Sequence, residues 1–418
     1  MKHKFNKVQV VGLGYIGLPT AVIIADHGID VVGLDVSQRV VDAINRGEIH
    51  VIESDLEKAA HRVVKEGKLR ATLSAEEADV FIIAVPTPFT DGHLPDLTYL
   101  MAAVRSIASS LRMGNIVILE STLPVGSTEN VCAYLKQLRP DLSFPDAAGD
   151  HADIRVAHCP ERVLPGHIMR ELVENDRVIG GISAACAMAA KAFYGIFVKG
   201  KCVVTNARTA EMTKLTENSY RDVNIAFANE LSIICGKLGV NVWKLIELAN
   251  LHPRVNILQP GPGVGGHCIA VDPWFIVSSA PQEARLIRTA REVNDSKPHY
   301  IIQRVKDAAA NVRSPVIACL GLSYKADIDD LRESPAMEIV KQLGEDNIGS
   351  LLVVEPHVKE LPRALADLKN IEKASLDDAI GRAHIVLLLV NHKEFTKLDH
   401  AALAGKTVID TRGIWRFL

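Results

Sequence analysis

The stretch Val8-Gln-Val-Val-Gly12-Leu-Gly14-Tyr-Ile-Gly17 decides the fold of the N-terminal part of the chain. An apolar, β-branched run leads into glycines in the spacing GxGxxG, and residues 18–27 after them have the pattern of a helix. Glycines so placed allow a tight turn and bring the backbone close to a pyrophosphate, which lies at the N-terminus of the helix. The stretch therefore predicts a dinucleotide site, although a glycine turn without a ligand has the same spacing.

Asp35 gives the predicted site its preference for one cofactor. It ends the next apolar run, eighteen residues after Gly17. A carboxylate at this place accepts hydrogen bonds from both ribose hydroxyls and repels a 2′-phosphate, so we expect NAD rather than NADP. Arg39, one helical turn further on, weakens that preference slightly.

Two later loops should line the same crevice. Ala84-Val-Pro-Thr87-Pro88 and Glu120-Ser-Thr122-Leu-Pro-Val-Gly-Ser127 each follow an apolar run. The carboxyl ends of parallel strands meet at one edge of a sheet, where ligands gather, although Pro, Gly and Ser are ordinary loop residues as well. The cofactor-binding residues predicted from all these segments are Gly12, Gly14, Tyr15, Ile16, Gly17, Asp35, Arg39, Thr87 and Thr122.

Strands alternating with helices recur at both ends of the chain. Candidate strands are residues 8–12, 30–34, 80–85, 116–120 and 155–158, then 316–320, 351–354, 385–390 and 407–409. Between them, residues 209–238 have apolar side chains at helical spacing, followed by a break and a helix at 242–250. The order predicts an α/β protein with two Rossmann-like parallel-sheet domains joined by a central long-helix region. The long helix is either an inter-domain spine with a dimer surface or an ordinary core helix.

The composition excludes several classes of protein. With 418 residues, 48% hydrophobic side chains and a formal net charge of -3, the chain is typical of a globular protein without nucleic-acid or membrane-surface binding. Its seven cysteines are odd in number and form no CxxC pair, which argues against a disulfide framework or a zinc ribbon. The apolar run at 8–13 is too short for a signal peptide or membrane span. We therefore expect a cytoplasmic protein with no metal.

The segment Gly265-Gly266-His267-Cys268-Ile-Ala-Val-Asp272 contains the cysteine best suited to chemistry. Two glycines before Cys268 give it little packing support and let a bulky substrate approach closely. A thiolate can add to an aldehyde, and loss of a hydride from the hemithioacetal leaves a thioester. Asp272 shares the face of Cys268 if a helix begins here. A buried structural cysteine is the alternative.

Lys214, Asn218 and Arg221 are spaced i, i+4 and i+7 in the long helix, so they share one stripe. Lysine can steady a developing oxyanion, although a solvated helix face is the ordinary explanation for such a triplet. Glu161, which follows the strand candidate at 155–158, is a candidate general base. Cationic and polar side chains also precede the glycine loop: His252, Arg254 and Asn256.

These motifs occur together in one known family. In order along the chain they are GxGxxG, Ser-Thr-x-Pro-Val-Gly, Pro-Glu, Glu211-x-x-Lys214-x-x-x-Asn218, Gly-Gly-x-Cys and Tyr324-Lys325. From end to end the chain resembles the UDP-glucose/GDP-mannose dehydrogenase family. The resemblance implies a homodimer of three-domain chains: an NAD-binding domain at 1–205, a central helical dimer core with the catalytic lysine and cysteine at 206–300, and a UDP-sugar-binding α/β domain at 301–418.

The resemblance also assigns cations in the C-terminal part. Lys325, Arg332 and Arg412 match positions where the family places ligand-binding cations, which suit a diphosphate because its oxygens take charge-assisted hydrogen bonds. Of these, Arg332 is expected to face NAD. The substrate-binding residues expected as a whole are Glu161, Arg162, Val163, Lys214, Asn218, Arg221, His252, Arg254, Asn256, Gly265, Lys325 and Arg412.

Within the family, the segments at 160–166, 252–256 and 260–274 are most similar to those of members that act on UDP-N-acetyl-D-mannosamine. Arg162 stands where glucose-specific members place an aromatic residue, which argues against UDP-glucose. UDP-N-acetylglucosamine stays open, because the two sugars differ only in configuration at C2. The implied reaction is a four-electron oxidation of the C6 alcohol to a carboxylate with two NAD+, in polysaccharide biosynthesis.

The family's mechanism implies roles for the oxidation steps. Lys214 and Asn218, with a water held by Asp272, take up the proton of the alcohol and steady its oxygen. Cys268 captures the aldehyde as a thiohemiacetal, which is oxidised to a thioester. Holding the aldehyde on the enzyme avoids release of a reactive intermediate.

Hydrolysis of the thioester is assigned to a water positioned by Glu161 and Thr122. Two rival functions remain open at this point. A two-electron hydroxy-acid dehydrogenase would need neither the third region nor Cys268. A non-catalytic NAD-binding regulator would leave Lys214, Asn218 and Cys268 without a joint purpose.

Overall fold

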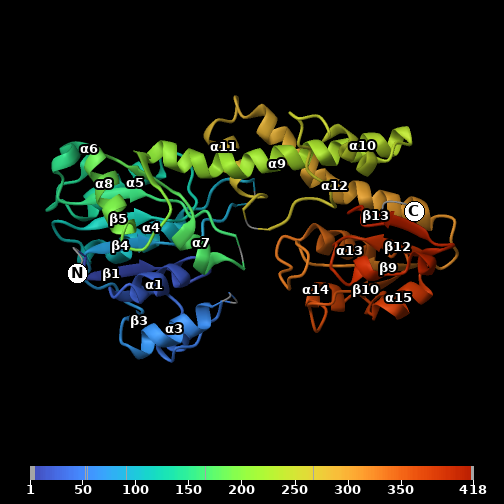
Figure 1. The fold of residues 1–418 in the computed structure, drawn as a ribbon, viewed down its shortest axis with the longest axis horizontal. Coiled ribbons are helices and arrows are strands. Elements are labelled where there is room, and N and C mark those ends of the chain that lie inside the picture. Colours follow the sequence, from blue (N-terminus) through green and yellow to red (C-terminus); the bar gives the residue numbers. More distant parts are fainter. Residues whose placement is uncertain are drawn as a thin grey trace. The chain divides into compact units, whose positions relative to one another are not determined.

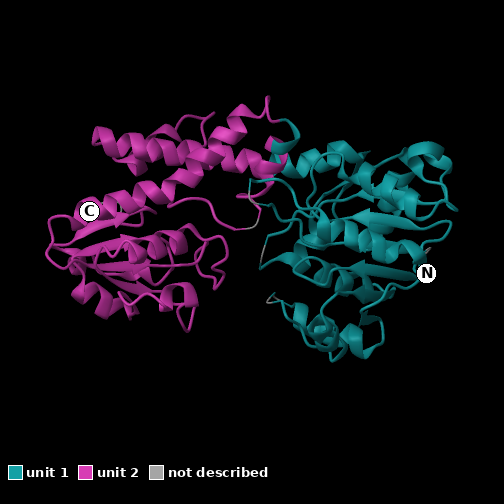
Figure 2. Ribbon diagram, turned by 180° about the vertical axis from the view of Figure 1, so that it is seen from behind, with its two compact units in different colours: residues 1–217, 278–280 teal, residues 218–277, 281–418 magenta. Residues whose placement is uncertain are grey.

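The computed structural model describes residues 5–415 except 52, 54, 91, 165 and 267. The chain divides into two compact units (Figure 2): residues 1–217 with 278–280, and residues 218–277 with 281–418. The division falls inside a helix of the predicted central region. The three-domain boundaries expected from the sequence stay a prediction.

Unit 1 is built around an eight-stranded sheet in the order β3-β2-β1-β4-β5-β6-β7-β8 (Figure 1). Every neighbouring pair is parallel except β6 and β7, which are antiparallel through Ala157 opposite Gly181 and His158 opposite Gly180. The strands are β1 (Lys7–Val11), β2 (Asp30–Leu34), β3 (Leu69–Thr72), β4 (Val80–Ile83), β5 (Ile116–Leu119), β6 (Arg155–His158), β7 (Arg177–Gly181) and β8 (Cys202–Asn206).

Helices cover both faces of this sheet, because its strands are apolar on both sides. Val10 packs in one cluster with α1, α2, α3, α7 and α8, and the next residue, Val11, packs in the other with α4 and α5. The helices are α1 (Gly17–Asp26), α2 (Gln38–Asn45), α3 (Leu56–Lys65), α4 (Thr98–Ile107), α5 (Ser127–Leu138), α6 (Pro145–Ala148), α7 (Ile168–Glu174) and α8 (Ala184–Tyr194), with short 3-10 turns at Ala108–Ser110 and Gly149–His151.

Unit 2 contains a five-stranded, wholly parallel sheet in the order β11-β10-β9-β12-β13. Apolar clusters lie on both of its faces. Its strands are β9 (Val316–Leu320), β10 (Ser350–Val354), β11 (Ile371–Lys373), β12 (Ile385–Leu388) and β13 (Thr407–Asp410). The helices are α10 (Val242–Ala249), α11 (Asp272–Ser279), α12 (Arg285–Ala309), α13 (Pro335–Glu345), α14 (Arg363–Ala366) and α15 (Leu376–Arg382), with 3-10 turns at Phe395–Lys397 and His400–Leu403. These two sheets confirm the predicted α/β fold.

The predicted long helix is α9 (Ala207–Leu238), and its 32 residues cross the division between the units. It ends before Gly239, whose φ of 68° no ordinary helix residue adopts, and α10 begins at Val242. Its apolar spacing does not mark its buried face: Phe227 and Ile234 are 54% and 43% exposed. Half of the side chains that it buries are polar: Glu211, Lys214, Asn218, Ser219, Asp222 and Asn229. Within the described residues, none of the helices is both long enough and apolar enough to cross a membrane.

Candidate active site

The glycine turn between β1 and α1 has the shape of a pyrophosphate cradle. Gly12 has a φ of 87°, and a Cβ on it would lie 2.6 Å from the carbonyl oxygen of Ala84. A Cβ on Gly17 would overlap the carbonyl oxygen of Gly12, whereas one on Gly14 would meet nothing within 4 Å. No side chain caps the N-terminus of α1, but the Leu18 N–H already donates to the Gly14 carbonyl oxygen at 3.1 Å and Pro19 has no N–H, so an anion would bind to the backbone of the glycine turn before these two residues. The turn therefore fits the pyrophosphate of a dinucleotide.

Asp35 fixes this turn as well as offering a site for ribose. Its Oδ2 accepts the backbone N–H of Leu13 at 3.0 Å and its Oδ1 accepts that of Ser37 at 2.9 Å. A carboxylate has about four acceptor positions, so capacity remains for ribose hydroxyls. Arg39 is exposed and Tyr15 is 38% exposed.

The loops after β4 and β5 lie together, because the two strands are parallel neighbours. The Thr87 hydroxyl donates to the backbone oxygen of Thr122 at 2.7 Å, and the Ser121 hydroxyl donates to that of Val85 at 2.6 Å. Thr122 is thus held by its backbone, and its hydroxyl is not used in this contact. The two loops form one wall at the carboxyl end of the sheet.

Glu211 attaches α9 to this wall, a role that the sequence analysis missed. Its buried carboxylate accepts the N–H groups of Gly126 at 2.6 Å and Thr128 at 2.7 Å, and the Thr128 hydroxyl at 2.6 Å. These groups open α5, so Glu211 caps that helix from α9. Its place on the same buried stripe as Lys214, three residues away, is the signal that could have indicated it.

Glu161 lies within unit 1 in the electrostatic field of Lys214. Burial raises the pKa of Glu161, and the charge of Lys214 opposes that rise. The Glu161 carboxylate also accepts the backbone N–H of Val163. A carboxyl group with a raised pKa beside a buried lysine is the kind of group that serves as a general base.

Arg162 is held against α9 by its neighbour Glu217. Its Nη2 lies 2.6 Å from Glu217 Oε1 and its Nε donates to Oε2 at 3.1 Å. The guanidinium is therefore already engaged in a two-point pair. Any contact with substrate would use its remaining N–H donors.

Cys268 opens the turn that leads into α11 in unit 2. Its carbonyl oxygen accepts the N–H of Val271 at 3.1 Å and of Asp272 at 2.9 Å. Asp272 is 3% exposed, and its Oδ2 accepts the Asn218 amide at 2.5 Å. The backbone of the cysteine is thereby linked to a buried amide–carboxylate pair reaching α9.

The thiol of Cys268 differs from the other thiols in accessibility. All seven cysteines lie among the described residues, none is in a disulfide, and Cys268 is the one that is exposed. Burial raises the pKa of Cys132 and Cys319 to about 12 and that of Cys159 to about 11, which makes them poor nucleophiles. Cys268 alone combines exposure with a glycine loop.

The glycines before Cys268 serve internal packing. A Cβ on Gly265 would lie 2.5 Å from the Glu333 carbonyl oxygen and 2.9 Å from Tyr324 Cβ, and one on Gly261 would lie 2.7 Å from Arg412 Nη1. The loop therefore fits closely against the segment after β9. These neighbours leave no room for a side chain at Gly261 and Gly265, and the close approach of a substrate to the loop stays a prediction.

The expected ligand cations differ in how they are held. Arg412 donates through Nε to the Leu389 carbonyl at 3.1 Å, and burial lowers its pKa to about 10. Arg332 is 63% exposed and paired with Asp330 at 2.6 Å. Several other expected substrate residues are exposed: Arg221, His252, Arg254, Asn256 and Lys325. Arg221 in particular does not join the buried pair of Lys214 and Asn218.

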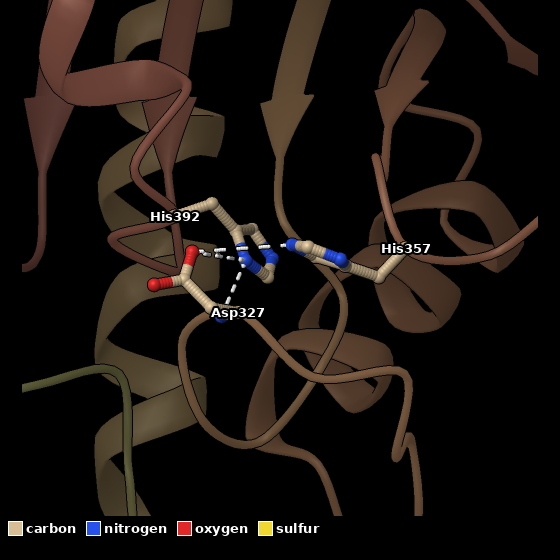
Figure 3. Close-up of side chains that lie close together, drawn as sticks. All are labelled: Asp327, His357 and His392. Carbon is tan, nitrogen blue, oxygen red and sulfur yellow. Dashed lines mark hydrogen bonds and ion pairs between the residues drawn. The ribbon is translucent and has the colours of Figure 1, made fainter.

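Asp327, His357 and His392 lie close together at the carboxyl ends of β9, β10 and β12 (Figure 3), with ligand atoms within 4.8 Å of one another. Both ring nitrogens of His392 have protein partners: Nδ1 accepts the Asp327 N–H at 2.9 Å and Nε2 lies 3.2 Å from Glu355 Oε2. A metal ligand needs a free nitrogen lone pair. Hydrogen bonding between three loops accounts for this cluster.

Two features indicate an NAD-dependent dehydrogenase. One is the glycine turn with the Asp35 carboxylate placed to bind a ribose, and the other is the exposed Cys268, whose backbone is linked to the buried Asn218–Asp272 pair. Three profiles of the UDP-glucose/GDP-mannose dehydrogenase family match the chain: the NAD binding domain at residues 6–198, the central domain at 208–296 and the UDP binding domain at 318–417. The chain belongs to this family.

Close relatives carry two kinds of name. The chain is 61% identical over 411 residues to an NDP-N-acetyl-D-galactosaminuronic acid dehydrogenase of Ralstonia nicotianae, covering 98% of this chain and 96% of that protein. It is 59% identical over 398 residues to a UDP-N-acetyl-D-mannosamine dehydrogenase of Campylobacter jejuni, covering 95% and 98%. A solved UDP-N-acetyl-mannosamine dehydrogenase from S. aureus has 43% identity and a TM-score of 0.85, with 98% of this chain and 95% of that one covered.

Proposed function

We propose that this enzyme oxidises the C6 alcohol of UDP-N-acetyl-D-mannosamine to the carboxylate, with Cys268 as a covalent nucleophile. The observation that carries the proposal is the exposed Cys268 whose backbone is anchored to the buried Asn218–Asp272 pair. The names of several close relatives support the same substrate. The glycine turn and Asp35 would hold NAD+, which would supply the hydride acceptor for the two oxidation steps.

Lys214 and Asn218 act on the oxygen of the reacting carbon. They stand one turn apart on the buried face of α9, where a charged amine and an amide N–H stabilise a developing oxyanion. Asp272 accepts from the Asn218 amide and so fixes which way it points. The Asp272 carboxylate, acting through a water, takes up the proton of the alcohol, because the charged lysine and the amide N–H are donors.

Cys268 adds to the aldehyde through its sulfur and gives a thiohemiacetal. Loss of the second hydride leaves a thioester, and water then cleaves the C–S bond, which releases the acid and regenerates the thiol. The raised pKa of Glu161 suits it to take the proton of that water, and Thr122 offers a hydroxyl to position it. Each substrate molecule therefore consumes two NAD+ and one water.

The sugar itself is tested with a substrate panel. We expect UDP-N-acetyl-D-mannosamine to give two NADH per molecule and to be preferred over UDP-N-acetylglucosamine and UDP-glucose. UDP-N-acetylgalactosamine belongs in the panel because a relative with 61% identity is named for N-acetyl-D-galactosaminuronic acid. Preference for it would replace the sugar assigned here and leave the chemistry intact. Net acid formation by Cys268→Ser at the wild-type rate would contradict the thioester step.

We further propose that the enzyme is a cytoplasmic homodimer joined through α9. Large apolar side chains stand exposed along this helix, Tyr220 at 68%, Phe227 at 54% and Leu238 at 69%, and an exposed apolar stripe is typical of an interface. Seven cysteines without a disulfide among them suit a reducing compartment. Sedimentation of wild type and Phe227→Asp tests the dimer, and cell fractionation tests the location.

A further inference from the structure

A further cavity lies within unit 2, lined in part by Pro260, which stands eight residues before Cys268. It is a half-open cavity with a volume of about 250 Å³, lined by the C-terminal end of α9, the start of α10, the middle of α12, and β13 with the segment after it. Figure 1 shows these elements on one side of that unit. No residue assigned above to catalysis or to binding of NAD or substrate lines it.

Lys297 is a buried cation in this cavity. It is 5% exposed, its Nζ donates to the Ser232 hydroxyl at 2.6 Å, and Nζ stands 4.8 Å from the centre of the Tyr300 ring. Among the ion pairs of the described residues, none contains Lys297. An ammonium group has three donors, so this one has spare N–H groups and no anionic partner. Burial lowers the pKa of Lys297 to about 7.

Two further side chains in the cavity, Trp415 and Arg304, offer hydrogen-bond donors. Trp415 is 2% exposed, and its indole Nε1–H has no acceptor among the described residues. Arg304 lies two turns after Lys297 on α12 and also faces the cavity. Asp410 is the lining carboxylate, and its oxygens are committed to the backbone N–H groups of Arg412, Gly413 and Trp415.

We propose that this cavity binds a small organic anion. The anion we have in mind is a small aromatic carboxylate or phosphate. Its acidic group would accept hydrogen bonds from Lys297, Arg304 and the Trp415 indole, and its aromatic ring would lie among Trp243, Tyr300 and Trp415. Buried donors without acceptors are costly, and an anionic ligand removes that cost. Sites for drug-sized molecules and cofactors occupy about 300–1,000 Å³, so the cavity suits a molecule smaller than a nucleotide sugar. The proposal is independent of the sugar assigned above.

Binding of such an anion should depend on pH in a defined direction. Lys297 carries its charge below its pKa and loses it above, and the other charged side chains that line the cavity are Arg304 and Asp410. Affinity should therefore be highest below pH 7 and fall as the pH rises through 7. An anion that binds to the charged lysine also raises the lysine's pKa, so binding above pH 7 takes up a proton.

Tryptophan fluorescence tests the proposal on the full chain, because two of its three tryptophans, Trp243 and Trp415, line the cavity. Phenyl phosphate and benzoate are the probes, and benzyl alcohol is the neutral control. We expect a saturable change with at least one anion and none with the alcohol. Lys297→Met should weaken binding about tenfold or more. Lys306→Met is the matched control, since Lys306 lies on the same helix, 2.7 Å from Asp346.

Three outcomes would overturn the proposal: no saturable change with either anion, an equal response to benzyl alcohol, or unchanged affinity in Lys297→Met. If Lys297→Met does not fold, Arg304→Met replaces it, because Arg304 is exposed on its outer side and tolerates truncation. Two results together would then also overturn the proposal. They are unchanged anion affinity in Arg304→Met, and wild-type anion affinity that does not fall between pH 6 and pH 8.

Discussion

Asp35 and Glu355 hold the same position in the two sheets of the chain. Each follows the second strand of its sheet and accepts the N–H of the residue after the glycine that follows the first strand: Leu13 donates to Asp35 at 3.0 Å and Leu322 donates to Glu355 at 2.7 Å. Each also accepts the N–H two residues further along, from Ser37 at 2.9 Å and His357 at 3.0 Å.

The correspondence covers five strands of each sheet, but the two carboxylates differ on the side where a ligand would bind. β3-β2-β1-β4-β5 and β11-β10-β9-β12-β13 have the same order, and Gly12 and Gly321 both have positive φ, 87° and 92°. Asp35 is partly exposed, whereas Glu355 is 2% exposed and its Oε2 also contacts His392 at 3.2 Å. Glu355 therefore holds loops together, and Asp35 alone of the two has acceptor capacity for a ribose.

Asp35→Asn should weaken NAD binding about tenfold or more, because it replaces a charged acceptor with a neutral amide. The substitution should also reduce the difference in affinity between NAD and NADP, because the repulsion of a 2′-phosphate is removed. Calorimetric Kd values for both dinucleotides check this. Glu355→Gln is the control, and its NAD affinity should match wild type. An unchanged ratio of NADP to NAD affinity would contradict the role given to Asp35.

Cys268 should be the thiol that iodoacetamide modifies first in the folded protein. It is exposed, whereas burial raises the pKa of Cys132, Cys159 and Cys319 and reactivity follows the thiolate. Mass spectrometry after a short exposure should find one added group per chain, located on Cys268, with activity lost in parallel. The Cys268→Ala variant should take up little label over the same time. Modification spread evenly over several cysteines would count against this assignment.

The sequence predicted well those features that depend on local pattern. The strand at residues 30–34 and the helix at 209–238 match β2 and α9 closely, because strand and helix periods are properties of neighbouring residues. The glycine turn was found for the same reason. Asp35 could be placed because the spacing from Gly17 is set by one strand–helix–strand unit.

Features that depend on distant partners could not be predicted. The buried stripe of α9 is polar because Glu211 caps α5, Asn218 pairs with Asp272, and Asp222 accepts from Arg291 at 2.6 Å. Each partner lies more than fifty residues away, so helical spacing alone could not show that Phe227 and Ile234 are exposed and these polar side chains buried. The antiparallel β6–β7 pair escaped prediction likewise.

Arg177→Met should destabilise unit 1 by about 3–5 kcal/mol, because it leaves the buried Glu120 carboxylate without its cation. Arg177 Nη1 lies 3.5 Å from Glu120 Oε1, which also accepts the Tyr194 hydroxyl at 2.7 Å. Urea unfolding of the variant measures the loss. Adding Glu120→Gln should recover at least part of it, since a neutral amide is easier to bury. Arg382→Met, which breaks an exposed pair with Glu372, should leave the unfolding midpoint unchanged.

His158 should make the protein less stable as the pH falls below neutral. It lies at the end of β6 with no exposed surface, and burial lowers its pKa from 6.5 to about 3. Between these values the unfolded chain binds a proton at His158 and the folded chain does not. The contribution to stability is therefore complete above pH 6.5 and decreases by about 1.4 kcal/mol per pH unit down to pH 3.

Urea unfolding of wild type and His158→Leu at several pH values between 4 and 7 isolates this contribution from that of the carboxylates, which both proteins share. The free energy of unfolding of wild type should fall more steeply with decreasing pH than that of the variant. Parallel curves would mean that His158 takes up its proton in the folded state as well. In that case the histidine must lie close to water or to an acceptor, contrary to its burial in β6.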